Sequence, residues 1–485
     1  MTKKRLLIII FTIISFILIP LLLRAEVGPA TIFNRVDNVV KRGEKRCLSN
    51  GGSIGVKVYS LDHKEPIYSH NGDTLLIPAS NMKLITTAAA LKVLHPDYRF
   101  KTSIFYDGKR TNSHIEGNLY LKGYGDPKLV LEEMWLMAHE IKNSGVKEIR
   151  GNIVADDSFF DKERYGHGWG KDLDSNPYNA KIGALSFNFN TVRVYVRPGD
   201  KVGDKPYVAL DPQTDAVDLV NMGKTVGAKD RGYLNVYSDN GGSKDRVVVK
   251  GELRINSEPK YYYRTISNPP LFAAKTFRSF LEKEGILVTG NITIGETPST
   301  AKELLQKESK SLSVIIRDLN KMSNNFVAEQ ILKTMGAEVI APPGTTAKGI
   351  KVVEDFLEKL GIKRGEYKMV DGSGLSKENR LTPAQIIKVL VYTDNDFTIK
   401  SDFISSLSVM GTDGTLKDRS IRNGKNRSVR AKTGTLDNVS SLSGYLKTAG
   451  GENLAFSIMV NGFRCSVDDV WELQNEIVDT LIEGK

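Results

Sequence analysis

The segment that decides the fold runs from Ile77 to Leu94 and reads IPASNMKLITTAAALKVL. Its composition, rich in Ala, Leu and Thr, predicts a helix over Asn81–Leu94. Ser80 opens this helix and Lys83 follows one turn later on the same face, so hydroxyl and amine can come within proton-transfer reach. The positive end of the helix dipole favours a nucleophilic oxygen there, and a lysine with a lowered pKa can act as its base. Taken alone, however, Ser80 is better explained as a helix N-cap.

Two further motifs follow in order along the chain. Ser323-Asn324-Asn325 lies in Leu319–Met335, which has a helical pattern, and Lys432-Thr433-Gly434 with Thr435 ends a predicted strand. A glycine in that strand lets a substrate backbone approach closely. Each motif has a plain alternative, since polar residues also cover solvated helix faces and lysines guard edge strands. The ordered triple in suitable contexts makes a catalytic set the better interpretation.

Strand patterns occur at both ends of the chain. Alternating or apolar runs separated by turn residues predict antiparallel strands at Ile54–Leu61, Pro66–His70, Ser428–Lys432, Ser440–Lys447 and Leu454–Asn461. Val467–Ile482 has a helical apolar face with Ser466 as its N-cap. We therefore expect one sheet that both termini complete.

The middle of the chain is organised differently. A helix-like stretch followed by Gly151-Asn152-Ile153 is repeated weakly before Gly290-Asn291-Ile292, and the two copies bracket about 115 residues of strand-and-turn sequence. We interpret this as nested insertion. The expected divisions are a signal or anchor at 1–25, a catalytic domain at 27–100 and 299–485, an inserted domain at 101–185 and 256–298, and a β-rich domain at 186–255.

The three motifs together resemble those of the serine penicillin-recognising enzymes, which carry Ser-x-x-Lys, Ser-x-Asn and Lys-Thr-Gly. Lys83 and Ser323 are 323 − 83 = 240 residues apart, far more than in compact members, and the excess matches the inserted region. That spacing resembles the class C low-molecular-mass penicillin-binding proteins, which are D-alanyl-D-alanine carboxypeptidases and endopeptidases. Gly125-Asp126-Pro127, Asp371–Ser376 and Gly411–Leu416 also look like segments of this family.

The resemblance implies a fold and a set of roles. The fold would be α+β, with a five-stranded antiparallel sheet, a helical subdomain and two smaller inserted domains. Ser80 would attack the carbonyl between two D-alanines and Lys83 would take its proton. The remaining roles would be proton relay by Ser323, amide binding by Asn325, positive potential from Lys432, and substrate contacts by Thr433, Gly434 and Thr435.

Two further substrate-binding residues rest on the resemblance alone. In this family an aspartate of the inserted domain contacts the amine end of a diaminopimelate side chain. Asp156 is the best match, although neighbouring Asp157 makes the assignment ambiguous. Lys377 stands where family members often have arginine, so it keeps the charge but loses the two-pronged hydrogen-bonding geometry.

Composition and charge limit the classes of ligand and partner that the chain is expected to bind. The chain has 485 residues, a net charge of +11 and ordinary globular composition. No Lys/Arg-rich run or aromatic-interleaved patch favours nucleic acid. Two cysteines and six scattered histidines make a metal site unexpected, and no cofactor is implied. The expected ligands are peptidoglycan peptides that end in D-Ala-D-Ala or carry D-Ala cross-links, with β-lactams as covalent inhibitors.

The N-terminus has the pattern of an export signal. Three basic residues precede Leu6–Leu23, which has no charge. We expect the body to lie in the periplasm or on the outer face of the cytoplasmic membrane, whether this segment is cleaved or kept as an anchor. A membrane surface is therefore a further partner that the sequence allows.

Two other functions stay open at this point. A β-lactamase on the same scaffold needs a deacylating base, and no convincing Glu-x-x-x-Asn segment lies between the second and third motifs. A membrane-tethered β-lactam receptor fits the single apolar segment, but no effector domain precedes Leu6.

The two cysteines present a separate question. Cys47 lies just before the first predicted strand and Cys465 between the last strand and the final helix. In a sheet completed by both termini they could be neighbours, and export would favour a bond between them. The alternative is two unpaired thiols.

Overall fold

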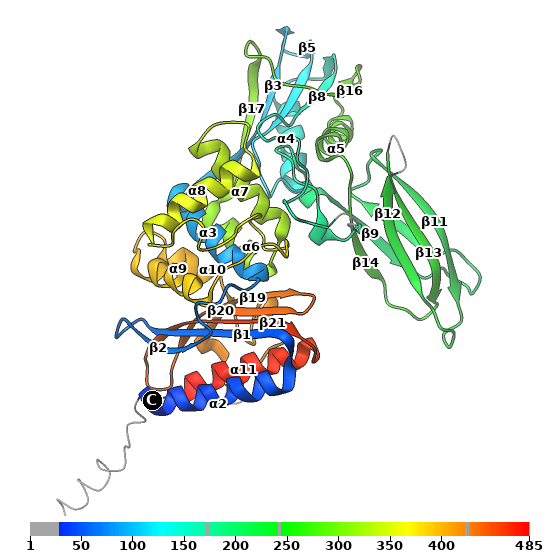
Figure 1. The fold of residues 1–485 in the computed structure, drawn as a ribbon. Helices are drawn as coiled ribbons and strands as arrows, with labels where there is room; N and C mark the ends of the chain where they lie inside the picture. The colour runs from blue at the N-terminus through cyan, green and yellow to red at the C-terminus, as the bar shows by residue number, and fades with distance from the viewer. Residues whose placement is uncertain (1–28, 171–173, 241–243, 422–423, 425, 485) are drawn as a thin grey trace, which may run out of the picture.

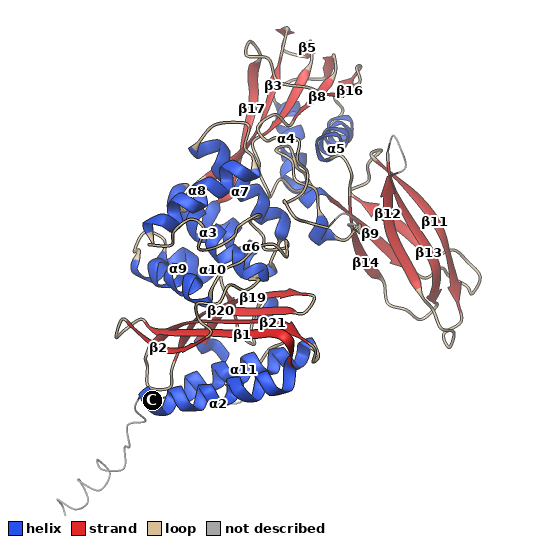
Figure 2. Cartoon of the chain, viewed as in Figure 1, coloured by secondary structure: helices blue, strands red, loops and turns tan. Residues whose placement is uncertain are grey.

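The computed structural model describes residues 29–484 except 171–173, 241–243, 422–423 and 425. The expected export segment lies outside the described residues. Figures 1 and 2 show three stacked regions: a sheet backed by helices, a cluster of helices above it, and a mixed region that carries a β lobe to one side.

The sheet nearest the two described ends of the chain is antiparallel and has six strands. Their order is β18 (Ser408–Val409), β19 (Val429–Leu436), β20 (Val439–Lys447), β21 (Asn453–Phe463), β1 (Leu48–Ser60) and β2 (Glu65–His70). Five strands were expected, and the sixth, β18, has only two residues, too few to leave a periodic pattern. The pairing of β1 with β21 confirms that both ends of the chain complete one sheet.

Helices cover both faces of this sheet. One face carries α2 (Pro29–Cys47) and α11 (Val467–Glu483), and Ser466 caps α11 as expected (Figure 1). The other face meets the helix cluster, which comprises the 3-10 turn Ala79–Asn81, α3 (Met82–Val93), α6 (Leu312–Met322), α7 (Asn325–Val339), α8 (Thr346–Lys359), α9 (Pro383–Asn395) and α10 (Lys400–Ser406). Ten of the twelve residues of α3 are buried, which agrees with a sequence in which eight of the twelve residues are apolar.

The mixed region holds two sheets and two helices. One sheet has the order β16 (Ile292–Ile294), β8 (Ile153–Asp156), β6 (Leu119–Gly123), β3 (Arg99–Tyr106) and β17 (Lys302–Ser311), and the other β15 (Leu287–Val288), β7 (Glu148–Arg150), β5 (His114–Glu116) and β4 (Lys109–Arg110). Helices α4 (Leu131–Asn143) and α5 (Pro269–Lys283) contact each other. The repeat seen in the sequence is therefore spatial, because β7 pairs with β15 and β8 with β16, in parallel.

The β lobe consists of two three-stranded sheets. Their orders are β10 (Tyr207–Asp211), β9 (Thr191–Arg197), β14 (Lys260–Thr265), and β11 (Val217–Val226), β13 (Asp245–Arg254), β12 (Leu234–Asn240). Buried valines of both sheets belong to one hydrophobic cluster. Where the domains begin and end along the chain stays a prediction.

Cys47 and Cys465 form a disulfide, with their Cα atoms 4.9 Å apart. Cys47 ends α2 and Cys465 follows β21, so the bond ties together the two chain ends of the sheet. It closes a loop of 418 residues.

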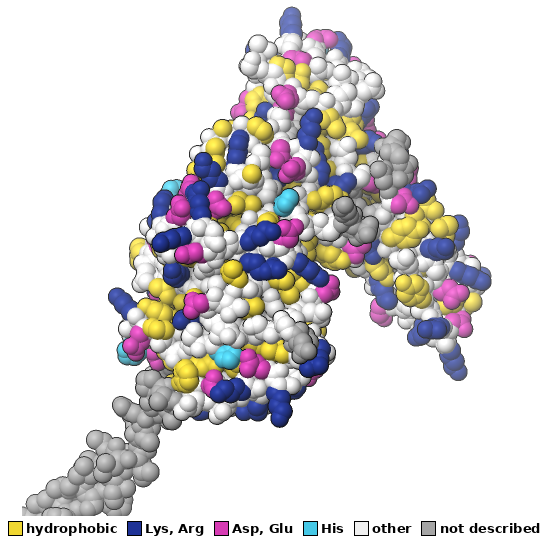
Figure 3. All heavy atoms as spheres, in the orientation of Figure 1, with side chains coloured by type: hydrophobic (Ala, Val, Ile, Leu, Met, Phe, Trp, Pro, Cys, Tyr) yellow, Lys and Arg dark blue, Asp and Glu magenta, His cyan; other side chains and the backbone are white. Residues whose placement is uncertain are grey.

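No helix within the described part of the chain is long and apolar enough to cross a membrane. On the face drawn in Figure 3, basic and acidic side chains are interspersed over all three regions.

Candidate active site

Ser80 lies in the 3-10 turn that leads into α3, between the helix cluster and the sheet. The turn forms because Ala79 adopts a left-handed backbone with φ of 46°, which redirects the chain into the helix. Gly374 passes directly beside it, and a Cβ there would lie only 1.8 Å from the Ala79 carbonyl oxygen. A glycine is therefore required at 374 to hold the Ser80 turn in place.

Lys83 is fully buried and its amine has three close oxygen neighbours. Its Nζ lies 2.8 Å from Ser80 Oγ, 2.7 Å from Asn325 Oδ1 and 2.6 Å from the Ser373 carbonyl oxygen. A neutral amine has two N–H donors and one lone pair. It can therefore donate to Asn325 and Ser373 while accepting the hydroxyl proton of Ser80.

The second motif forms a break between two helices. Ser323 was expected inside one continuous helix, but α6 ends at Met322, Ser323 has φ of 55°, and α7 begins at Asn325. The left-handed residue turns the chain, and Asn324 caps the new helix through its bond from the Val327 N–H. As a result Asn325 Oδ1 reaches Lys83, while its Nδ2 donates to the Tyr178 carbonyl at 3.1 Å.

The third motif comes from strand β19, where Lys432 is fully buried. Its amine donates to Ser323 Oγ at 2.8 Å and to the Thr433 carbonyl at 2.7 Å. Its backbone carbonyl accepts a bond from Asn81 Nδ2 at 2.9 Å, which fastens the strand to the Ser80 turn. The three motifs, distant in sequence, therefore meet in one place.

Gly434 lies where β19 passes the Ser80 turn. A Cβ at this position would lie 2.8 Å from the Ser80 backbone nitrogen and 2.3 Å from Ser441 Oγ. Thr433 Oγ1 donates to Thr415 Oγ1 at 2.7 Å, whereas Thr435 is exposed. The strand thus presents a threonine on either side of a glycine beside the serine.

Burial shifts the pKa of both site lysines downward. Loss of solvent lowers the pKa of Lys83 to about 7, although Asp371 and Glu329 oppose the shift. Burial first, and then the positive charge of Lys83, bring the pKa of Lys432 well below its ordinary value. Lys83 is thus able to be neutral near neutral pH, which a general base must be.

A loop at residues 371–376 supports Lys83 from behind. Glu329 is fully buried on α7 and accepts the N–H groups of Gly372 and Ser373 at 3.0 and 2.8 Å. These bonds orient the Ser373 carbonyl toward Lys83. Burial, and then the neighbouring Asp371, raise the pKa of Glu329 to about 7. Sequence patterns pointed to this loop only through the resemblance, and they did not point to Glu329.

The inserted region contributes to the same surroundings. Trp169 Nε1 donates to Asp371 Oδ2 at 3.0 Å, and the Tyr178 carbonyl accepts from Asn325. Both residues lie more than 140 positions from their partners, and neither belongs to a short motif. No local sequence signal could have identified them.

Asp156 is not brought to this site. It was expected to face substrate, but its side chain is fully buried at the end of β8. Lys122 lies 3.0 Å away, and the Ser158 hydroxyl and the Thr297 N–H donate to it at 2.6 and 2.7 Å. Burial alone would raise the pKa of Asp156, but these hydrogen bonds outweigh it and the pKa is lowered. The structure gives no support to the expected substrate contact of Asp156, because its carboxylate is buried and bonded to Lys122, Ser158 and Thr297, and the contact stays a prediction.

The other acidic candidate is also occupied, since Asp157 is paired with Arg164. Lys377 is more than half exposed and forms an ion pair of 3.0 Å with Asp437, in the turn that follows β19. Lys377 therefore lies at the rim, next to the end of the Lys432 strand.

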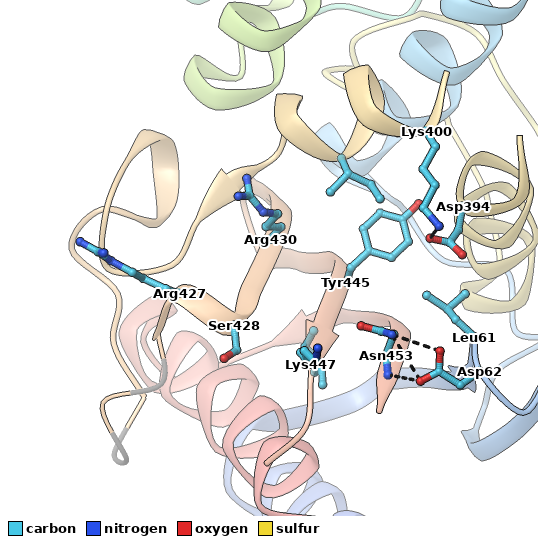
Figure 4. Close-up of a pocket in the computed structure, with 12 residues that line it drawn as sticks. Leu61, Asp62, Asp394, Lys400, Arg427, Ser428, Arg430, Tyr445, Lys447 and Asn453 are labelled. Carbon is cyan, nitrogen blue, oxygen red and sulfur yellow. Dashed lines mark hydrogen bonds and ion pairs between the residues drawn. The ribbon is translucent and has the colours of Figure 1, made fainter. Parts of the chain in front are cut away.

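A separate pocket of about 470 Å³ lies at the other end of the same sheet (Figure 4). It is lined by residues such as Arg427, Arg430, Tyr445 and Lys447, and includes none of the three motifs. In Figure 4, the carboxylate of Asp62 accepts hydrogen bonds from the backbone N–H and the side-chain Nδ2 of Asn453. This pocket is therefore not the candidate active site.

Residues 37–483 match the D-Ala-D-Ala carboxypeptidase 3 (S13) family. A D-alanyl-D-alanine carboxypeptidase of Actinomadura sp. (strain R39) is 34% identical over 426 residues, covering 85% of this chain and 78% of the relative. D-alanyl-D-alanine carboxypeptidase DacB of Haemophilus influenzae is 27% identical over 421 residues, covering 86% and 87%.

Solved structures give the same picture. The crystal structure of penicillin binding protein 4 (dacB) from Haemophilus influenzae superposes with a TM-score of 0.80 at 25% identity, covering 91% of this chain and 99% of that one. A second structure of that protein, complexed with a β-lactam, has a TM-score of 0.72.

Proposed function

The chain belongs to the D-Ala-D-Ala carboxypeptidase 3 (S13) family, and on this premise we propose that Ser80 is the nucleophile of a D,D-carboxypeptidase and D,D-endopeptidase reaction on peptidoglycan. The observation that carries the proposal is the 2.8 Å contact between Lys83 Nζ and Ser80 Oγ. The match to this family favours the peptidase function over the two alternatives on the same scaffold, a β-lactamase and a β-lactam receptor.

Acylation begins with the neutral amine of Lys83. Asn325 and the Ser373 carbonyl hold two of its protons, so the lone pair is directed at the Ser80 hydroxyl. Lys83 takes the proton as Ser80 Oγ bonds to the carbonyl carbon between the two D-alanines. The negative charge on the carbonyl oxygen is bound by the N–H groups of Ser80 and Thr435, each worth roughly 3–4 kcal/mol in other enzymes.

The leaving amine then needs a proton. Ser323 is placed to relay one, because its hydroxyl contacts the Lys432 amine at 2.8 Å. When the carbon–nitrogen bond breaks, the terminal D-alanine or the cross-linked peptide departs and the acyl group stays on Ser80. The relayed proton is the one that Lys83 took from Ser80, so Lys83 is neutral again when water attacks the ester. Lys83 then takes a proton from the water and returns it to Ser80 Oγ as the ester bond breaks, which restores the enzyme.

When Lys83 is neutral, its charge no longer lowers the pKa of Lys432, which favours a protonated Lys432. The Lys432 amine is buried and already bonded to Ser323, so it attracts the substrate's terminal carboxylate by electrostatic potential and not by direct contact. Thr433 and Thr435 supply direct contacts from the strand, and Asn325 Nδ2 binds the penultimate amide. A β-lactam presents the same carbonyl and carboxylate but releases no amine, so it acylates Ser80 and remains bound.

The substrate also defines where the enzyme acts. Peptidoglycan lies outside the cytoplasm, and the N-terminal pattern of basic residues followed by Leu6–Leu23 supports a periplasmic body or one held at the outer face of the membrane. The Cys47–Cys465 disulfide supports the same location, because such bonds persist in oxidising compartments.

Covalent labelling tests the proposal. A labelled penicillin should attach to Ser80, and Ser80→Ala should abolish both labelling and release of D-alanine from a soluble pentapeptide. Ser257→Ala is the matched control, because Ser257 also precedes a lysine by three positions, but with Pro259 between them. Label that survives Ser80→Ala, or that maps to Ser257, would refute the assignment.

A further inference from the structure

One sheet face of the β lobe carries a cluster of exposed tyrosines. In β9 the valines at 192, 194 and 196 are fully buried, so the alternate residues Arg193, Tyr195 and Arg197 point to the other side. Tyr195 pairs with Tyr261 of β14, and Arg197 pairs with Tyr207 of β10, so these residues share that outer side. We call this surface, with Tyr195, Tyr207, Tyr261, Tyr263, Arg193 and Arg197, the tyrosine face.

The rings form a contiguous group. The Tyr195 ring centroid is 5.3 Å from that of Tyr261 and 6.1 Å from that of Tyr207. The guanidinium of Arg193 lies 5.2 Å from the Tyr261 ring, and that of Arg197 lies 4.9 Å from the Tyr207 ring. Tyr207 and Tyr261 are still more than half exposed. These cross-strand ring contacts stabilise the sheet by only about 0.2–1 kcal/mol each. They leave ring surface exposed to water, and a contiguous exposed group of this kind marks an interaction surface.

The side chains of the tyrosine face indicate which class of ligand it can bind. Ala209 is the only aliphatic side chain at the outward positions opposite Tyr195, so the face lacks the leucines and valines of a protein core. Arg193 is paired with Asp211, and Arg197 has Asp200 at 3.5 Å, so the arginines add hydrogen-bond donors but little net charge. Flat rings edged by hydroxyls and guanidinium groups fit a sugar ring, which has an apolar face and a polar rim.

The position of the face agrees with the substrate. β9 and β14 lie on the side of the lobe nearer α6 and β19 in the view of Figure 1. The buried valines of β9 belong to one hydrophobic cluster with valines of the other sheet of the lobe, so the tyrosine face looks away from that sheet, toward the side on which the helix cluster lies in Figure 1. A peptide bound at Ser80 would remain attached to its sugar chain, which has to extend past this region.

We propose that the tyrosine face binds the glycan strand of peptidoglycan while the attached peptide occupies the active site. This inference rests on the proposed function, since it takes peptidoglycan as the substrate. The face would retain the enzyme on the polymer and raise its activity on sacculi, without affecting small soluble substrates.

The test uses the full chain with Ser80 already acylated by penicillin, so that the active site is blocked. The ligand is insoluble peptidoglycan whose peptide stems have been removed enzymatically. Wild-type protein should sediment with this glycan, and Tyr195→Ala/Tyr261→Ala should weaken binding by about tenfold. Tyr233→Ala is the matched control, because Tyr233 is 76% exposed and precedes β12 in the other sheet. Tyr195→Phe/Tyr261→Phe should bind nearly as wild type, because the rings remain.

Three results would overturn the proposal. The first is equal binding by the alanine variant and wild type. The second is wild-type binding that requires the peptide stems, which would mean that the peptide is recognised. The third is loss of wild-type binding when salt is raised about tenfold, since ring stacking is not screened. Penicillin labelling and D-alanine release from soluble pentapeptide, measured on every variant, test the proposed function separately and should stay unchanged.

Discussion

Replacing Gly434 by alanine should damage catalysis far more than stability. The added Cβ would lie 2.8 Å from the Ser80 backbone nitrogen, 3.0 Å from Ala79 Cβ and 2.3 Å from Ser441 Oγ. Ser441 cannot simply rotate away, because its hydroxyl donates to the Pro78 carbonyl at 2.7 Å. To reach an ordinary contact of about 3.5 Å, β19 and the Ser80 turn must separate by about 0.7 Å.

The magnitude follows from that displacement. Overpacking of this kind costs about 1–3 kcal/mol of unfolding free energy, so the melting temperature should fall by only a few degrees. A misplacement near 1 Å in a catalytic site can cost about 10²-fold in rate, and here it separates Ser80 from the strand that carries Lys432. The acylation rate with a fluorescent penicillin should therefore fall about a hundredfold.

Gly170→Ala serves as the control, since it adds the same methyl group where nothing lies within 4 Å. Gly434→Ala/Ser441→Ala should recover part of the melting temperature, because the nearest clash is gone. It should not recover acylation, because the Ser80 nitrogen is still too close. Wild-type acylation by Gly434→Ala would refute the reasoning that β19 must pass this close to Ser80.

Three other predictions concern charge and covalent links. Because burial lowers the pKa of Lys83 to about 7 and only the neutral amine accepts a proton, acylation should rise with pH through 7, about tenfold between pH 6 and 8; a flat profile would exclude Lys83 as the base. Cys47→Ser/Cys465→Ser should lower the unfolding free energy by about 2–5 kcal/mol in thermal melts, and unchanged melting would mean that the bond contributes nothing. Asp156→Asn should lower the melting temperature, because it weakens the buried ion pair with Lys122. Peptide hydrolysis and penicillin acylation should change by the same factor. A loss of hydrolysis confined to peptides with a free side-chain amine would instead show that Asp156 contacts the substrate.

Local patterns predicted the parts of the site that depend on neighbouring residues. Ser80 and Lys83 are three positions apart, so a single helical turn brings them together. The strands β19, β20 and β21 and the cap of α11 at Ser466 also follow from short-range alternation and capping chemistry. Local patterns do not decide whether the cysteines are bonded, because only the pairing of β1 with β21 brings Cys47 next to Cys465.

The rest of the site depends on tertiary contacts, which the pattern of apolar residues along the sequence does not reveal. The sequence around Ser323 has a continuous helical pattern, so it does not show that Ser323 adopts a left-handed backbone between two helices. That backbone conformation directs the Ser323 hydroxyl at Lys432. Glu329 reads as one more polar residue in a helix, although it is buried and orients the Ser373 carbonyl. Asp156 matches a substrate-binding aspartate of the family in sequence, but sequence does not show that Lys122 lies 3.0 Å from its carboxylate.

The sheet that carries Lys432 has a consequence for how the chain is made. Its strands come from both ends of the sequence, whereas every strand of the mixed region and the β lobe lies between Arg99 and Ser311. Ser80 is synthesised 432 − 80 = 352 residues before Lys432, which is roughly 20–70 s at ~5–20 residues per second. The inserted region can fold during this interval, but the serine cannot acquire its partners. The nascent enzyme is therefore inactive until its last strands are made, and a truncated chain should form a folded insert without ever attacking a peptide.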